Sequence, residues 1–79
     1  MITPEQCRAA RALLNRSQKE LAEATGVSLR SIQGFEAGDR VLQSLAMSAV
    51  ERILESEGID LINQADWIGV KLRLHQSRA

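Results

Sequence analysis

The 79-residue sequence contains one cysteine, Cys7, and one histidine, His75, and its ten basic residues are balanced by ten acidic ones. One cysteine cannot form a disulfide within the chain, and together with one histidine it cannot supply the ligands of a structural zinc site. We therefore expect no metal and no cofactor. A formal charge of zero also excludes a polycation that coats nucleic acid. Any binding to DNA must depend on where the charges lie.

Long apolar runs are also missing, and none approaches the roughly 20 residues needed to cross a membrane. The N-terminus lacks the basic and then apolar pattern of a signal peptide, so we expect a soluble, cytoplasmic protein without a membrane partner. His75 has no arrangement of Ser, Cys or Asp around it, and Cys7 is typical of a small core residue. The sequence therefore predicts no catalytic residue and no enzyme.

The composition that is present is that of a small folded domain. Hydrophobic residues make up 44% of the chain and charged residues 25%, which is close to the average of globular proteins. A chain of 79 residues can build one small core and little more. We expect a single domain over residues 1–79.

The first predicted helix begins at a full set of start signals. Thr3 is a suitable cap, Pro4 fits the first helical position, and Gln6 stands three residues after the cap, where its side chain can reach back. The helix should run to about Asn15. Its inward residues recur at spacings of three and four, which lie on one helical face: Cys7, Ala10 and Leu14, with Leu13 beside them.

Two further short helices follow, over residues 18–25 and about 29–37. Each begins after a serine that can cap it and ends near a glycine that can take positive φ: Ser17 and Gly26 for the first, Ser28 and Gly38 for the second. Ser17 and Glu20 also have the spacing of a second capping box. The third helix should turn Ile32 and Phe35 inward.

The strongest periodicity in the chain follows these helices. Apolar residues recur at helical spacing without a miss, which predicts an amphipathic fourth helix that ends at Gly58. These residues are Leu42, Leu45, Ala46, Ala49, Val50, Ile53 and Leu54. The exposed side should carry Glu51, Arg52, Glu55 and Glu57.

After Gly58 the hydrophobic period changes from 3.6 to two, which indicates a strand with one apolar face: Ile68, Val70, Leu72 and Leu74. Residues 59–62 are the expected partner strand, and residues 63–66 the turn of a β-hairpin. The fold class is therefore mainly α, with about four helices over residues 4–57 and a C-terminal hairpin over residues 59–75. The last residues should fray.

The segment from Ser17 to Gly38 carries a pattern of small, turn-forming and apolar residues. Ala22 lets two helices cross closely, Gly26 makes the turn between them, and Val27 with Ile32 fills their angle. With Ser17-Gln18, Leu21, Ser28 and the ending Phe35-Glu36-Ala37-Gly38, this segment resembles the helix-turn-helix of the lambda repressor and Cro class, the Xre-type regulators. The opening Thr3-Pro4-Glu5-Gln6 is similar to a small subgroup of them. The resemblance implies a lambda-repressor-like bundle that binds double-stranded DNA.

The resemblance also implies that the second helix of the motif enters the major groove. Leu29, Arg30 and Gln33 are then the base readers, with Gly34 next to them. Arg30 is the first candidate, since a guanidinium can donate two hydrogen bonds to guanine, worth roughly 1–3 kcal/mol of discrimination. Leu29 can only pack on a thymine methyl group. A glycine inside a helix costs about 1 kcal/mol relative to Ala, so Gly34 indicates that another group, such as the DNA, approaches closely there.

Other positions are expected at the DNA backbone or within the fold. Gln18 matches a family position that touches a phosphate, at a helix start whose N–H groups add to the site. The further phosphate candidates are Ser17, Lys19, Ser28 and Arg40. Arg11 and Glu36 match positions at which the family places a partly buried ion pair.

The apolar residues of the hairpin have two interpretations, which can both hold. Trp67, Ile68, Val70 and Leu72 can pack on the fourth helix or pair across a dimer. A two-stranded hairpin leaves open edges that readily pair with another chain, which favours a homodimer. The leading hypothesis is a repressor that binds an inverted-repeat operator as a homodimer, with half-sites about 34 Å apart. The alternative is a protein-interaction module, such as an antitoxin or a phage-derived adaptor, whose hairpin captures a partner protein.

The neutral total hides an uneven distribution of charge. Residues 1–40 contain six basic and five acidic residues, residues 41–66 one and five, and residues 67–79 three and none. The acid is therefore concentrated in the fourth helix and the segment after it. We expect modest nonspecific affinity for DNA and a strong dependence on base contacts and dimerisation.

Overall fold

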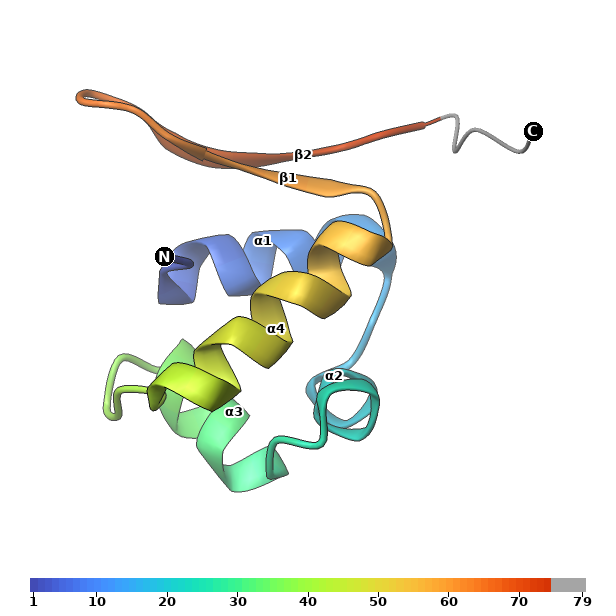
Figure 1. Cartoon of the computed structure of the whole chain (residues 1–79), viewed down its shortest axis with the longest axis vertical. Coiled ribbons are helices and arrows are strands. Elements are labelled where there is room, and N and C mark those ends of the chain that lie inside the picture. Colours follow the sequence, from blue (N-terminus) through green and yellow to red (C-terminus); the bar gives the residue numbers. More distant parts are fainter. Residues whose placement is uncertain (75–79) are drawn as a thin grey trace.

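The structure, a computed structural model, describes residues 1–74 (Figure 1). It contains four helices and then two strands: α1 (Pro4–Leu14), α2 (Gln18–Thr25), α3 (Leu29–Glu36), α4 (Ser44–Ser56), β1 (Ile59–Asn63) and β2 (Ile68–Leu72). The strands pair antiparallel. The predicted helical bundle with a C-terminal hairpin is confirmed. The predicted fraying of the C-terminus and His75, the last residue of the predicted hairpin, lie outside the described residues.

The predicted caps set the helix boundaries. The Gln6 backbone N–H donates to Thr3 Oγ1 at 3.1 Å, and the Thr3 backbone N–H donates to Gln6 Oε1 at 3.0 Å. Ser17 and Glu20 form the same reciprocal pair at 2.9 and 2.8 Å. Gly26, at φ +77°, ends α2 in the left-handed conformation that glycine adopts without strain. These bonds satisfy backbone N–H groups that have no partner within a helix.

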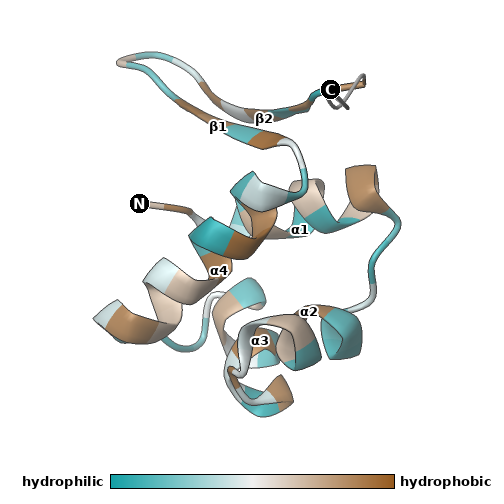
Figure 2. Ribbon diagram, turned by 45° about the vertical axis from the view of Figure 1, so that its right-hand side comes forward, coloured by the Kyte–Doolittle hydropathy of each residue, from teal (hydrophilic) through white to brown (hydrophobic). Residues whose placement is uncertain are grey.

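The core lies where the four helices meet beneath the hairpin, and it is formed by Ile2, Cys7, Ala10, Leu21, Ala22, Ile32, Phe35, Leu42, Met47, Val50, Leu54 and Ile59. Two residues that were expected to face inward do not. Leu13 is 46% exposed because it lies beside the buried stripe of α1, and Leu45 is 87% exposed. Leu45 belongs to the first turn of α4, which extends past α1 and α3 (Figure 2). Periodicity therefore gave the right face of α4 but the wrong length of its buried part.

The exposed side of α4 is also only partly as expected. Arg52 and Glu55 are exposed, whereas Glu51 and Glu57 are half-buried. Glu51 Oε2 accepts a hydrogen bond from the Ile2 backbone N–H at 2.7 Å, and Glu57 forms an ion pair with Arg16. Both acids therefore tie α4 to earlier parts of the chain.

The hairpin packs mainly on α1, through β2, and touches α4 through β1. The prediction of packing on the fourth helix is therefore wrong for β2. In the register Leu61 pairs with Val70 and Ile59 with Leu72, so these four side chains share one face. They lie against the core. Apolar and less apolar residues alternate along β2 (Figure 2), whereas β1 has two adjacent apolar residues, Leu61 and Ile62. The tip extends beyond the helices, where Trp67 is 72% exposed (Figure 1).

Gln6 joins the hairpin to α1 through polar contacts. Its side chain is 1% exposed, and Nε2 lies within hydrogen-bonding distance of Ile62 O at 3.1 Å, Asn63 Oδ1 at 3.0 Å and Gly69 O at 2.9 Å. One side-chain amide therefore reaches both strands while its oxygen completes the cap of α1.

In the described part of the chain no helix is long and apolar enough to cross a membrane.

Candidate nucleic-acid interface

The packing of α2 on α3 follows from small and β-branched residues at the crossing. Ala22 is buried on α2, Ile32 is fully buried on α3, and Val27 packs against the core from the turn between them. Thr25 Oγ1 donates to Leu21 O at 2.8 Å and accepts from the Val27 backbone N–H at 3.1 Å, which closes the turn. The crossing therefore holds α3 in one fixed orientation on the surface of the bundle.

One face of α3 is buried and the opposite face is exposed. Ile32, Phe35 and Glu36 are buried, whereas Arg30 and Gln33 are exposed and Leu29 lies at 36% exposure. Arg30 forms no ion pair with any residue in the range 1–74. The three side chains predicted to read bases therefore lie together on the outward side of α3, and the guanidinium of Arg30 is not occupied by an acid.

Glu36, the last residue of α3, lies at the centre of a buried polar network. Arg11 on α1 donates from Nε to Glu36 Oε2 and from Nη2 to Glu36 Oε1, both at 2.7 Å. This pair matches the ion pair that the family resemblance implied. Gln18 Nε2 donates to Oε1 at 3.0 Å, and Cys7 Sγ donates to Oε2 at 3.1 Å. The network joins α1, α2 and α3, and no pattern in the sequence indicated the contributions of Cys7 and Gln18.

The network shifts the pKa values of its members. Burial raises the pKa of Glu36, but the hydrogen bonds from Arg11, Cys7 and Gln18 outweigh it and leave that pKa below its ordinary value. Burial and the neighbouring Glu36 carboxylate strongly raise the pKa of the Cys7 thiol. This shift favours the protonated thiol, which donates to Glu36 within the packed network.

The phosphate candidates lie at the starts of α2 and α3. Ser17 and Ser28 cap these helices, and Lys19 is exposed in the first turn of α2. Gln18 is half-buried, because its amide is oriented by Glu36. One hydrogen of its Nε2 serves Glu36 and the other is available to an acceptor. Side-chain donors and the N-terminal N–H groups of α2 together suit an anion.

Gly34 and Arg40 lie against each other. A Cβ atom at Gly34 would come within 3.2 Å of Arg40 Cβ and 3.3 Å of both Arg40 Cδ and Nε. The close approach indicated by a glycine inside a helix is therefore present, and a side chain of the same protein makes it.

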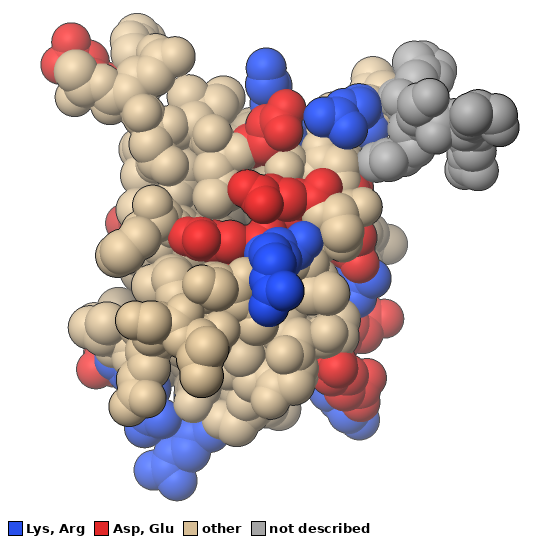
Figure 3. All heavy atoms as spheres, viewed as in Figure 1, with Lys and Arg blue, Asp and Glu red and all other residues tan. Residues whose placement is uncertain are grey.

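Charged side chains are unevenly spread over the face shown in Figure 3. Acidic side chains gather over α4 and the base of the hairpin with a basic one among them, and further basic side chains lie at the hairpin and at the lower end of the molecule, near α3. The acid that the sequence concentrates in the fourth helix and the segment after it therefore forms a patch on this face. Such a patch repels a polyanion that approaches the α4 side.

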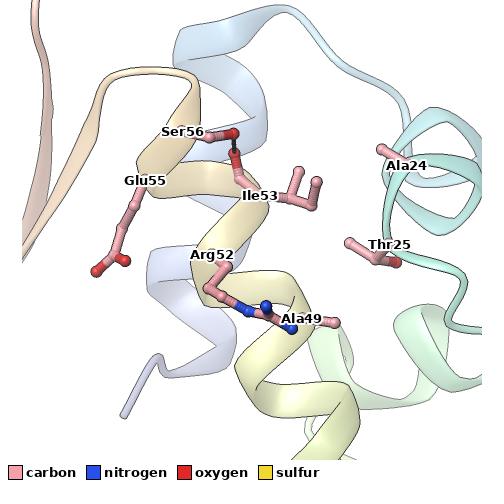
Figure 4. A pocket seen from close by; sticks show the side chains of 7 residues that line it. All are labelled: Ala24, Thr25, Ala49, Arg52, Ile53, Glu55 and Ser56. Carbon is pink, nitrogen blue, oxygen red and sulfur yellow. Dashed lines mark hydrogen bonds between the residues drawn. The ribbon is translucent and has the colours of Figure 1, made fainter.

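A groove between α2 and α4 is lined by small and apolar groups of Ala24, Ala49 and Ile53, with Arg52 and Glu55 at its rim (Figure 4). No residue of α3 lines it, and its two charged residues do not converge on one point in the close-up. Within residues 1–74 no three His, Cys, Asp or Glu side chains are placed to hold a metal ion. The exposed face of α3 is therefore the candidate site.

The comparison with protein families identifies the motif that contains α2 and α3. The family model described as helix-turn-helix, which covers the Xre and lambda-repressor-like proteins, matches residues 8–60, about two thirds of the chain and all of α2 and α3. No protein with curated annotation matches the chain. The chain therefore belongs to this helix-turn-helix family and is a DNA-binding regulator.

Proposed function

We propose that this regulator is a sequence-specific repressor that inserts α3 into the major groove of an inverted-repeat operator. The observation that carries the proposal is the rigid, outward face of α3, where Leu29, Arg30 and Gln33 stand together above a buried face locked by Glu36. Arg30 takes the main part, because its guanidinium can contact both acceptors of a guanine. Repression then follows from occupation of a promoter.

The backbone contacts come from the starts of the two motif helices. Gln18 donates to a phosphate from the hydrogen of Nε2 that does not serve Glu36, and Ser17, Lys19 and Ser28 surround the same strand of DNA. These contacts set the register of α3 and carry no sequence information themselves. Because few cations take part, the dependence of affinity on salt should be shallow.

The proposed repressor is a homodimer that pairs through its hairpins. The tip exposes Trp67 and Ile68, and the outer edges of both strands have unpaired backbone groups in the described structure. Val70 and Leu72 pack against the core of their own chain, so they hold the hairpin in the position from which it would pair. The hairpin lies at the opposite end of the molecule from α3, so pairing there leaves both recognition helices uncovered (Figure 1).

Binding of the whole protein to a duplex selected from a random pool tests the proposal. Arg30→Ala should weaken binding to the selected site by about 5- to 100-fold, which corresponds to a loss of roughly 1–3 kcal/mol. Arg52→Ala is the matched control, because it removes an exposed arginine from α4 (Figure 4). It should bind as the wild type does. Equal binding by the Arg30→Ala and wild-type proteins would show that α3 is not the reading surface.

A second function is favoured by the same exposed tip. A hairpin that presents Trp67 and Ile68 can add its edge to a strand of another protein, as in an antitoxin or an adaptor. The two functions differ in how substitutions act: loss of the tip would abolish capture of that protein while α3 still binds DNA as a monomer.

A further inference from the structure

The exposed face of α3 has one position without a side chain. Arg30, Gln33 and Gly34 are spaced as i, i+3 and i+4, so they are neighbours on one side of the helix. Gly34 lies in the helix interior, where glycine is unfavourable and φ is not positive, so no backbone conformation requires it. Its reason is space: Arg40 occupies the volume that a side chain at residue 34 would need.

The chain is folded back to bring Arg40 to this place. Gly38 adopts φ +82°, and the backbone N–H of Asp39 donates to Gly34 O at 2.9 Å. This bond spans five residues and turns the segment after α3 back along the helix. The Arg40 side chain then runs across Gly34, with Cβ, Cδ and Nε all close to it.

We infer that Arg40 is a base-reading residue that replaces the side chain missing at Gly34 and extends the reading face beyond Arg30 and Gln33. The inference rests on the proposed insertion of α3 into the major groove. It revises the expectation that Arg40 holds a phosphate, and it identifies guanine as the base that Arg40 selects, through paired acceptors O6 and N7.

The contact with Gly34 favours a base over a phosphate. Arg40 is exposed and pairs with no acid within residues 1–74, so its guanidinium can bind DNA. Its Cδ and Nε lie against Gly34, the residue next to Gln33 on the face proposed to contact the base edges. The contact with Gly34 also restricts the long side chain before binding, and a preordered arginine loses less entropy when it forms two hydrogen bonds.

Selection of duplexes from a random pool by wild-type and Arg40→Ala proteins tests the role of Arg40. The variant should lose the preference for guanine at one position of each half-site, keep the preferences that depend on Arg30, and bind the wild-type site about 5- to 100-fold more weakly. If the variant weakens binding to all sequences alike and reduces the salt slope by about one, Arg40 is a phosphate contact and the inference is wrong.

A double-mutant cycle tests the role of Gly34. Gly34→Ala must displace Arg40 by a few tenths of an ångström, so it should weaken binding in the wild type. Its effect on the Arg40→Ala protein should be smaller, because Cδ and Nε are gone and only the contact with Cβ remains. An equal loss in both backgrounds would mean that the DNA itself needs the space, and would overturn the inference. Circular dichroism of Gly34→Ala verifies that the helices are intact.

The proposed function and this inference fail in different ways. If the wild-type protein enriches no sequence, or if Arg30→Ala binds as the wild type does, the proposed function is wrong and the inference with it. If Arg30→Ala loses specific binding but the Arg40→Ala protein selects the wild-type sequence, only the inference is wrong.

Discussion

Two regions of this molecule are fastened to α1 by buried polar side chains, and the two fastenings differ in kind. Glu36, 3% exposed, holds the end of α3 with a charged network that includes Arg11. Gln6, 1% exposed, holds both strands of the hairpin with a neutral amide. The helix proposed to face DNA is thus held by charge, and the hairpin by uncharged hydrogen bonds.

The difference matters because a buried charge without its partner costs more free energy than a buried neutral group without its partner. When one partner of a buried ion pair is lost, the other remains charged and poorly solvated, which costs about 3–5 kcal/mol. A lost neutral hydrogen bond leaves one polar group unsatisfied, at about 1–3 kcal/mol. The orientation of α3 should therefore be all-or-none, whereas the hairpin can separate locally from α1 without unfolding the bundle.

The largest expected effect comes from breaking the charged network. Arg11→Met removes the two bonds to Glu36 and also the bond from Nη1 to Arg16 O at 3.0 Å. We expect a loss of about 3 kcal/mol in the free energy of unfolding, measured by urea denaturation, at the low end for such pairs because Arg11 is partly exposed.

The control is the double variant Arg11→Met with Glu36→Met, which removes both charges. It should recover part of the loss, because no uncompensated carboxylate remains in the core. If the double variant is less stable than Arg11→Met by the full cost of a second large substitution, the charged network is not what holds α3.

Gln6→Met should have the next largest effect, and a local one. The substitution keeps the size of the side chain but leaves the carbonyls of Ile62 and Gly69 without the amide, so we expect a loss of about 1–3 kcal/mol. Amide hydrogen exchange should show lost protection in β1 and β2 while α2 and α3 keep theirs.

Thr3→Ala is the matched control for Gln6→Met. It removes the cap of α1, worth about 1 kcal/mol, and leaves the amide of Gln6 on the hairpin. Equal loss of hairpin protection in Thr3→Ala and Gln6→Met would mean that the cap, and not the amide, fastens the strands.

Acid should weaken the contact of Glu36 with Arg11 more than the contacts of Gln6 with the hairpin. The pKa of Glu36 in the folded protein lies below its ordinary value of 4.5, so its contribution to stability is complete above that pH. It is lost as the pH falls through the lower, folded value. The free energy of unfolding between pH 7 and pH 3 should therefore fall less steeply for Glu36→Gln than for the wild type.

Glu55→Gln is the control for this pH dependence, because it removes an exposed carboxylate from α4. It should keep the wild-type profile. Identical acid profiles for the wild type and for Glu36→Gln would contradict the assigned role of Glu36.

The parts of the fold that the sequence predicted are those set by local spacing. Thr3 with Gln6 and Ser17 with Glu20 lie three residues apart, so each cap could be identified from adjacent letters. The second role of Gln6 could not, because its partners lie 56 to 63 residues away and the bonds go largely to backbone carbonyls, which every residue has. Long-range contacts to the backbone leave no pattern in a sequence.

The candidate site shows the same division. The cost of a glycine inside α3 indicated a close approach at Gly34, but the approaching group, Arg40, depends on how the chain folds back after Gly38. Periodicity placed Leu45 inward because it reports one face of a helix, not how far the neighbouring helices extend. The helix motif could therefore be predicted from the sequence, whereas the packing of Arg40 against Gly34 could not.

The smallest effect on stability should come from a substitution of Trp67. This substitution tests whether the hairpin tip forms the dimer without disturbing the contacts that hold the hairpin on α1. Trp67→Ser changes a side chain that is 72% exposed at the hairpin tip, so the monomer should lose less than about 0.5 kcal/mol. If the tip forms the dimer, light scattering at tens of micromolar protein should show a dimer for the wild type and a monomer for Trp67→Ser.

Leu45→Ser is the matched control, since Leu45, like Trp67, is an exposed apolar residue, 87% exposed on α4. A dimer broken by Leu45→Ser and unaffected by Trp67→Ser would move the interface to the first turn of α4. The hairpin would then be a surface held on α1 by Gln6 and available to a different protein.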